Sequence, residues 1–238
     1  MSMMSRAWTL IFFLVVLGGC GSKAPVVVEK KPVVKTIAVM QVVEPTKMEI
    51  QNLSSVMFLV PIASIAFNSD SKHKSKIFAA AMARQNMTMG SVLTNVLVEE
   101  LKGGGYDVVI VDAVPVPEDE PDEMDYRQFK TDVDAILYVY FDDVGLHSGA
   151  GSNDYRPRVN ISGALHLKDV EDDFYHEDFS YGVDARAGKS WAVMADPRYA
   201  YPSFEAVIAK APEIREAFES GAQAIGRRMA ADIKSALK

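Results

Sequence analysis

Three segments in which nearly every residue is apolar constrain the fold of this chain more than any other feature. They are residues 36–43 (TIAVMQVV), 106–112 (YDVVIVD) and 134–144 (DAILYVYFDDV). A strand with one face in water alternates apolar and polar residues, whereas a strand covered on both faces is apolar nearly throughout. We therefore expect three strands, with 36–43 and 134–144 in the centre of a mixed sheet, and an α/β fold class.

Two helices are expected to cover that sheet. The middle helix should span residues 76–102, after a polar loop at 68–76 in which Ser75 is a plausible N-cap, and Gly90 is a point where it can divide. The final helix should begin near Pro212, because proline is favoured in a first helical turn. Its apolar stripe has helical spacing and consists of Ile214, Phe218, Ile225, Met229, Ile233 and Leu237.

Residues 159–183 carry the clearest hairpin pattern. Apolar and polar residues alternate on both strands, which predicts one buried and one solvent-facing side. With the turn centred on Glu171, His166 lies directly opposite His176 on the polar side, and Asp178 is one step further along. Opposed residues have Cβ atoms about 5 Å apart, close enough for two imidazoles to share a metal ion. The alternative is two solvated histidines, and we assign no metal because no further ligand can be located.

Three further segments have residue types that occur in ligand sites. Residues 103–105 are glycines, but a phosphate loop has the order strand, glycines, helix, and here the order is reversed. These glycines are expected to end the middle helix. The acidic segment 115–125 lacks the EF-hand pattern and is expected to be a solvated loop. Tyr199 and Tyr201 form either an aromatic patch that binds peptides or part of the core.

The N-terminal residues predict an exported protein. Arg6 supplies a positive charge, and residues 8–17 form an apolar run of ten residues, too short to span about 30 Å of hydrocarbon. The run ends in Leu17-Gly18-Gly19-Cys20, which resembles the lipobox of bacterial lipoproteins. The resemblance implies that residues 1–19 are a cleaved signal peptide and that Cys20 is acylated on its sulfur and its new amino group. The alternative is an unmodified cysteine in an ordinary signal peptide or membrane anchor.

The same resemblance has implications for location. Gly21 follows the cysteine where lipoproteins of the inner membrane usually carry Asp, which implies delivery to the outer membrane. Residues 20–34 are then the lipidated cysteine and an extended tether, since Pro25 and Pro32 favour an extended chain. Residues 35–238 are expected to form a single periplasmic α/β domain.

Charge and cysteine content exclude several classes of function. The chain has 25 basic and 32 acidic residues, a net charge of −7, and loss of Arg6 with the signal peptide makes it −8. Binding to nucleic acid needs clustered Lys and Arg, so no nucleic-acid partner is expected. An acidic surface also discourages docking on anionic headgroups, so attachment to the membrane should come from the lipid alone. A single cysteine excludes an intrachain disulfide framework and a cysteine-rich zinc site.

The order of the predicted elements carries a second resemblance. A strand KTIAVMQVV, a helix ending LTNVLVEELKGGGYDVVIVD, a strand DAILYVYFDDV, a hairpin and a final helix follow one another. This order is similar to the small α/β domain of outer-membrane lipoproteins of the CsgG curli-secretion type, of lipoprotein activators of penicillin-binding proteins, and of the amino-terminal domain of TolB. The similarity covers most of residues 36–238, but residues 44–74 depart from it. It transfers no functional residues beyond the lipobox.

These observations favour a binding protein over an enzyme. The sequence contains no G-x-S-x-G, no H-E-x-x-H and no nucleotide loop, and no cofactor is expected. We expect a non-enzymatic lipoprotein of the outer membrane, facing the periplasm, that binds another envelope protein or itself as an assembly or regulatory subunit of secretion or cell-wall machinery. The alternatives are a periplasmic lipoprotein that binds a small ligand or metal, and an envelope hydrolase.

Overall fold

The computed structural model describes most of the chain after the predicted leader. The described residues are 33–52, 61–114, 132–148, 152–168, 170 and 172–238, with side chains described from residue 71 onward in the first helix. They belong to one compact unit, Pro32–Lys238. The predicted lipobox, most of the predicted tether and the acidic segment 115–125 lie outside the described residues.

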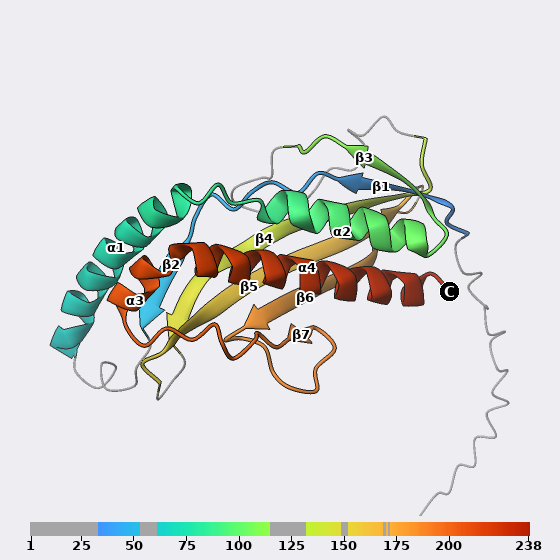
Figure 1. Cartoon of the computed structure of the whole chain (residues 1–238). Helices are drawn as coiled ribbons and strands as arrows, with labels where there is room; N and C mark the ends of the chain where they lie inside the picture. Colours follow the sequence, from blue (N-terminus) through green and yellow to red (C-terminus); the bar gives the residue numbers. More distant parts are fainter. Residues whose placement is uncertain (1–32, 53–60, 115–131, 149–151, 169, 171) are drawn as a thin grey trace, which may run out of the picture. The chain divides into compact units, whose positions relative to one another are not determined.

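The described strands form one seven-stranded mixed sheet (Figure 1). They are β1 (Thr36–Met40), β2 (Glu49–Asn52), β3 (Asp107–Val111), β4 (Ala135–Ser148), β5 (Tyr155–Leu167), β6 (Asp173–Gly182) and β7 (Ala192–Val193). The order is β3-β1-β4-β5-β6-β7, and β2 pairs with the second half of β4. β1 runs parallel to β3 and β4, whereas β5 is antiparallel to β4 and β6. The predicted mixed sheet with a long antiparallel hairpin is confirmed, and so are the interior positions of β1 and β4.

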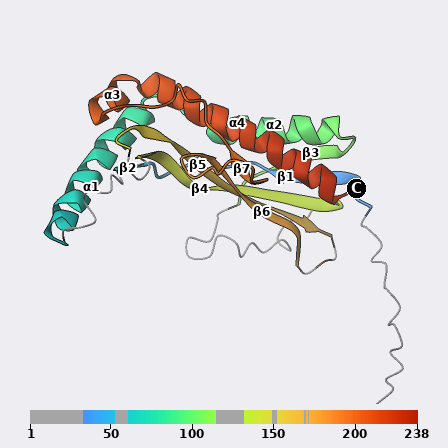
Figure 2. The same cartoon turned by 90° about the horizontal axis from the view of Figure 1, so that it is seen from below.

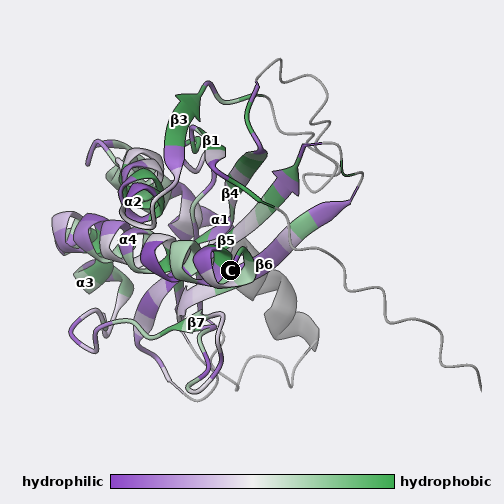
Figure 3. Ribbon diagram, turned by 90° about the vertical axis from the view of Figure 1, so that its right-hand side faces the viewer, coloured by the Kyte–Doolittle hydropathy of each residue, from purple (hydrophilic) through white to green (hydrophobic). Residues whose placement is uncertain are grey.

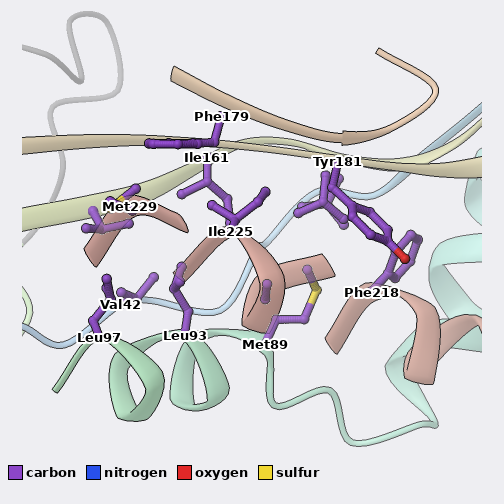
Figure 4. Close-up of a cluster of buried hydrophobic side chains, with 14 of the residues drawn as sticks. Val42, Met89, Leu93, Leu97, Ile161, Phe179, Tyr181, Phe218, Ile225 and Met229 are labelled. Atoms are coloured by element: carbon purple, nitrogen blue, oxygen red, sulfur yellow. The ribbon is translucent and has the colours of Figure 1, made fainter. Parts of the chain in front are cut away.

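Two helices, α2 (Met89–Gly103) and α4 (Ala211–Ala236), lie side by side on one face of the sheet (Figures 1 and 2). α2 packs over β1 and β3, and α4 packs over β5 and β6. Figure 4 shows Ile225 of α4 between Leu93 of α2 and Ile161 of β5, and all three side chains are fully buried. This arrangement confirms the predicted cover of the sheet by a middle helix and a C-terminal helix.

The apolar stripe predicted for the last helix is the part of α4 that packs on the sheet. Its members from Ile214 to Ile233 are fully buried, and Leu237 packs against the same core. Pro212 lies in the first turn, where its missing N–H costs no hydrogen bond. A short helix, α3 (Phe204–Ala209), precedes α4, and Ser203 caps it by accepting a hydrogen bond from the Ala206 amide.

The predicted loop at 68–76 and the predicted continuous helix at 76–102 are wrong. Residues Pro61–Ala83 form one helix, α1, and the chain then breaks before α2 begins at Met89. The described part of α1 buries only Phe78 and Met82, so its sequence lacks the apolar periodicity that reveals a helix. Ser75 caps no helix: its hydroxyl bonds to the backbone of Ile50 in β2.

The break between α1 and α2 lies before Gly90 rather than at it. Asn86 has a positive φ of 49°, a backbone conformation that Asn tolerates better than most residues. Gly90 lies inside the first turn of α2, where a Cβ would collide with the backbone oxygen of Val42. Its amide and that of Ser91 donate hydrogen bonds to Oε1 of Glu44, at 2.9 Å and 3.3 Å. Gly90 is thus required by close packing, not by a bend.

The three glycines do end α2, as predicted. Gly104 is the C-cap, and its amide donates to the Leu101 oxygen at 2.9 Å. Gly105 has a φ of 91°, which few other residues adopt, and this turn leads directly into β3.

Candidate functional site on the sheet face opposite the helices

The second face of the sheet presents the residues that alternate with the core on β4, β5 and β6. On β5, Val159 and Ile161 face α4 and are fully buried, so Arg158, Asn160 and Ser162 face the other way. Arg158, Asn160 and Ser162 make polar side-chain contacts on this face, which is the candidate site.

The structure does not bring the predicted histidine pair together. His176 pairs with Ala164, and after an irregularity at Leu165/His166 the partner of His166 is Asp173. The predicted register, with the two histidines opposed, is therefore wrong, because paired residue numbers sum to 340 along most of the ladder and not to the 342 that a turn centred on Glu171 requires. The hairpin is centred one residue earlier, and the irregularity at Leu165/His166 shifts the pairing by one further residue next to the turn.

Each predicted metal candidate has a local acidic neighbour instead. His166 Nδ1 lies 3.5 Å from Asp173 Oδ1, and His176 Nε2 lies 3.7 Å from Asp178 Oδ1. Within the part of the chain that the structure describes, no three His, Cys, Asp or Glu side chains lie close enough to hold a metal ion.

Arg158 is the centre of an ion-pair network that the sequence analysis missed. Its Nη1 lies 2.5 Å from Asp143 Oδ2, and its Nε donates to Asp184 Oδ2. Asn160 Nδ2 donates to the same Asp184 oxygen at 3.0 Å. Burial raises the pKa of Asp143 despite the neighbouring Arg158 guanidinium. For Asp184, burial acts in the same direction, but hydrogen bonds from Asn160 and Arg158 outweigh it and lower the pKa.

His147 lies beneath this network and is only 2% exposed. Burial, and then the nearby charge of Arg158, lower its pKa to about 4 from the ordinary 6.5. Its Nδ1 is 3.5 Å from Arg158 Nη1, and because arginine only donates, Nδ1 is the acceptor and Nε2 carries the proton. A neutral imidazole held in this way is suited to packing rather than to proton transfer near pH 7.

Ser162 lies between two carboxylates on the same face. Its Oγ is 2.5 Å from Asp142 Oδ2 and 2.5 Å from Asp178 Oδ1, and its single hydrogen can serve only one of them at a time. His176 contacts Asp178, so the order of the groups is Ser, Asp, His. In a hydrolase triad the histidine contacts the serine and takes its proton. This arrangement does not support the hydrolase alternative.

Tyr199 and Tyr201 belong to the core, which is the second of the two interpretations of these residues. Both are almost completely buried, and burial raises the pKa of Tyr201 above its ordinary value. Arg198 covers the Tyr199 ring, with its guanidinium carbon 4.6 Å from the ring centroid, and it pairs with Glu216 of α4 at 2.6 Å. The two tyrosines therefore attach the segment before α3 to the sheet and α4.

Comparisons with known proteins assign no family to the chain. No protein-family model and no curated protein sequence matches it. A protein from Xanthomonas campestris of the DUF330 family aligns with 87% of this chain over 89% of its own length, at TM-score 0.41 and 8% identity. A putative neuraminyllactose-binding hemagglutinin homolog from Helicobacter pylori aligns with 88% over 86%, at TM-score 0.31 and 11% identity. Similarity at these TM-scores carries no argument about function.

The predicted site of lipidation, Cys20, lies outside the described residues, together with Leu17, Gly18 and Gly19. Among the helices that the structure describes, none combines the length and the apolar character needed to cross a bilayer.

Proposed function

We propose that this protein is a lipoprotein of the bacterial outer membrane whose α/β domain faces the periplasm and binds another envelope protein. The observation that carries the proposal is the position of Cys20. It ends the sequence Leu17-Gly18-Gly19-Cys20 directly after a ten-residue apolar run, and the compact unit begins at Pro32. An export signal, an acylation site and a folded domain follow one another without overlap.

The number of residues between the proposed anchor and the domain fits this role. Residues 21–31 separate Cys20 from the compact unit. At about 3.1 Å per residue, an extended segment of this length reaches roughly 30 Å. Such a reach lets the domain contact proteins that project from the membrane while lipid chains hold it to the surface.

The chemistry of the examined face favours binding over catalysis. Arg158 pairs with two carboxylates, and His147 is buried and neutral. Around Ser162, the histidine contacts the aspartate and not the serine, so it cannot take the proton of the serine hydroxyl. Because these groups bond to one another, none of them is placed to act on a substrate, and the proposal is therefore binding.

The anchor is tested by replacing Cys20 with Ser in the full chain. The variant should remain uncut, lose all acyl chains and leave the outer-membrane fraction, as measured by mass spectrometry of the N-terminus and membrane fractionation. Ser22→Ala is the matched control, because it changes a neighbouring residue and leaves the lipobox intact. A mature N-terminus elsewhere, or a Cys20 without lipid in the parent, would refute the proposal.

Partner binding is tested by photo-crosslinking in the native envelope. A photoreactive residue is placed at Val109 or at Arg156, both exposed, and at Lys189 in an exposed loop as the control. We expect a discrete adduct from Val109 or Arg156 that disappears when Cys20→Ser removes the lipid and the protein is no longer delivered to the outer membrane. An identical set of adducts from all three positions would mean that the domain has no specific partner.

A further inference from the structure

Among the described strands, β3 has an outer edge whose backbone hydrogen-bonding groups have no partner strand. β3 is the terminal strand of the sheet, and its inner side pairs in parallel with β1. The Asp107 amide donates to the Lys35 oxygen, and the Val111 oxygen accepts from Gln41. In a parallel ladder, alternate residues point both backbone groups to the same side. Asp107, Val109 and Val111 therefore face β1, and Val108 and Ile110 present their N–H and C=O groups outward.

The other free edge near this end of the sheet is closed by a side chain. Ile50 of β2 has both its outward backbone groups bound by Ser75 of α1, whose Oγ accepts from the Ile50 amide at 3.2 Å and donates to the Ile50 oxygen at 3.4 Å. Covering an edge with a helix is a common protection against unwanted strand pairing. No such contact to Val108 or Ile110 exists among the described residues.

The side chains along β3 are apolar although they face water. Val109 is 48% exposed and Ile110 is 54% exposed, and they project to opposite faces of the sheet. Figure 3 shows β3 as a hydrophobic strand with a hydrophilic start. Natural edge strands are commonly protected by charged side chains or proline, and β3 has neither between its two ends.

Both ends of this open edge are acidic. Asp107 and Asp112 are exposed and flank the apolar residues, and the whole chain carries a net charge of −7. A strand that pairs here with acidic residues at its own ends would be repelled. A strand with Lys or Arg at both ends would gain favourable electrostatic interactions at each end.

We propose that the outer edge of β3 binds an extended segment of a partner protein, with alternating apolar residues flanked by basic ones, as an additional strand of the sheet. The backbones of Val108 and Ile110 would form the hydrogen bonds to this segment, and the side chains of Val109 and Ile110 would form the apolar contacts. Asp107 and Asp112 would favour a segment with basic ends. The proposal rests on the proposed binding of another envelope protein and names the kind of segment that it contributes.

The test uses the detergent-solubilised full chain and two synthetic peptides. One is Lys-Lys-Thr-Val-Thr-Val-Thr-Lys-Lys, and the other has Glu in place of every Lys. Hydrogen exchange of residues 106–112 is followed by mass spectrometry while each peptide is titrated. At a peptide concentration ten times its dissociation constant, exchange through opening of the edge should slow by up to about tenfold. We expect this slowing with the Lys peptide and less than a twofold change with the Glu peptide.

Ile110→Pro separates strand addition from nonspecific adsorption. The substitution removes an outward N–H and leaves the hydrogen bonds between β3 and β1 intact, and proline is tolerated on edge strands. Ile110→Val is its matched control, because it keeps the N–H and the β-branched side chain. We expect Ile110→Pro to abolish the slowing and Ile110→Val to retain it. Asp107→Asn combined with Asp112→Asn keeps the edge open and should remove the difference between the two peptides.

Three results would overturn the proposal. They are the absence of slowing with the Lys peptide up to its solubility limit, equal slowing by both peptides, and slowing that persists in Ile110→Pro. Sedimentation that finds the parent chain self-associated and Ile110→Pro monomeric would also overturn it, because a second copy would then fill the edge. None of these measurements depends on Cys20, so they can fail while the lipoprotein proposal stands.

Discussion

Replacing Gly221 with Ala has two opposite effects on stability, because alanine favours the helix but its Cβ crowds the core. Gly221 of α4 lies on the ring of Tyr181 in β6, and both residues are buried. An ideal Cβ at Gly221 would lie 2.7 Å from Tyr181 Cδ1 and 3.0 Å from both Cε1 and Cγ. Carbon atoms in contact normally stay about 3.5 to 4.0 Å apart, so the helix or the ring has to move.

The two effects have known sizes. Alanine is favoured over glycine in a helix interior by about 1 kcal/mol, and overpacking a core costs about 1 to 3 kcal/mol. The contact here is with an aromatic ring close to its own backbone, which cannot move aside as the end of a flexible side chain can. Packing should therefore win, and we expect Gly221→Ala to lower the free energy of unfolding by up to about 2 kcal/mol. For a domain of this size that is a decrease in Tm of up to about 8 °C.

The assay is thermal and urea unfolding of the variant beside Gly103→Ala. Gly103 is the last residue of α2, and a Cβ there meets nothing within 4 Å, so this control should be neutral or more stable by up to about 1 kcal/mol. If Gly221→Ala melts at or above the parent, α4 does not press on β6 as closely as the structure has it, and the packing argument fails.

Three further changes test other parts of the fold. Asp134 Oδ2 accepts from the Lys35 and Thr36 amides, both at 2.8 Å, and these bonds lower its pKa. The Asp134 carboxylate should therefore stabilise the folded domain above about pH 4, and this stabilisation should be lost as the pH falls through the lower pKa of the folded state. We expect Asp134→Asn to lower the free energy of unfolding, measured in urea, at pH 7 and to lower it progressively less in acid. The pKa of His147 is about 4 in the folded state and 6.5 in the unfolded chain, so the unfolded chain takes up a proton first as the pH falls. The free energy of unfolding of the parent should therefore fall by roughly 3 kcal/mol between pH 6.5 and 4, and His147→Asn should lack this contribution. His166→Ala with His176→Ala should leave zinc binding unchanged in calorimetry, and loss of a tight one-to-one site would contradict the observed register.

The sequence predicts correctly those elements in which the spacing of apolar residues follows directly from which positions are buried. The stripe of α4 repeats at helical spacing because one side of the helix contacts the sheet, and the apolar run of β4 is interior because strands lie on both sides of it. The glycines after α2 were equally predictable, because the positive φ of Gly105 is a local requirement. In each case the residue that reveals the element is the same residue whose burial or backbone conformation the fold requires.

The predictions for α1 and for the hairpin register are wrong for a different reason. The part of α1 whose side chains are described, residues 71–83, buries Phe78 and Met82 only, so no apolar periodicity distinguishes it from a loop. The register of β5 against β6 depends on where the hairpin turn is centred and on one irregularity at Leu165/His166, and no residue type there identifies either of them. The Arg158 network joins β4 and β5 to Asp184 in the turn after β6, so it could not be predicted before the register was known.

β3 shows where the rule for buried strands breaks down. Its apolar run is as continuous as that of β1, yet β1 is interior and β3 forms the edge, with Val109 and Ile110 half exposed. Hydrophobic periodicity records how a strand's two faces are covered, but not whether another strand lies beside it. An apolar sequence on an open edge is costly for a soluble protein unless the edge is covered in use. The discrepancy between the composition of β3 and its position is therefore the physical reason to expect a strand from a partner there.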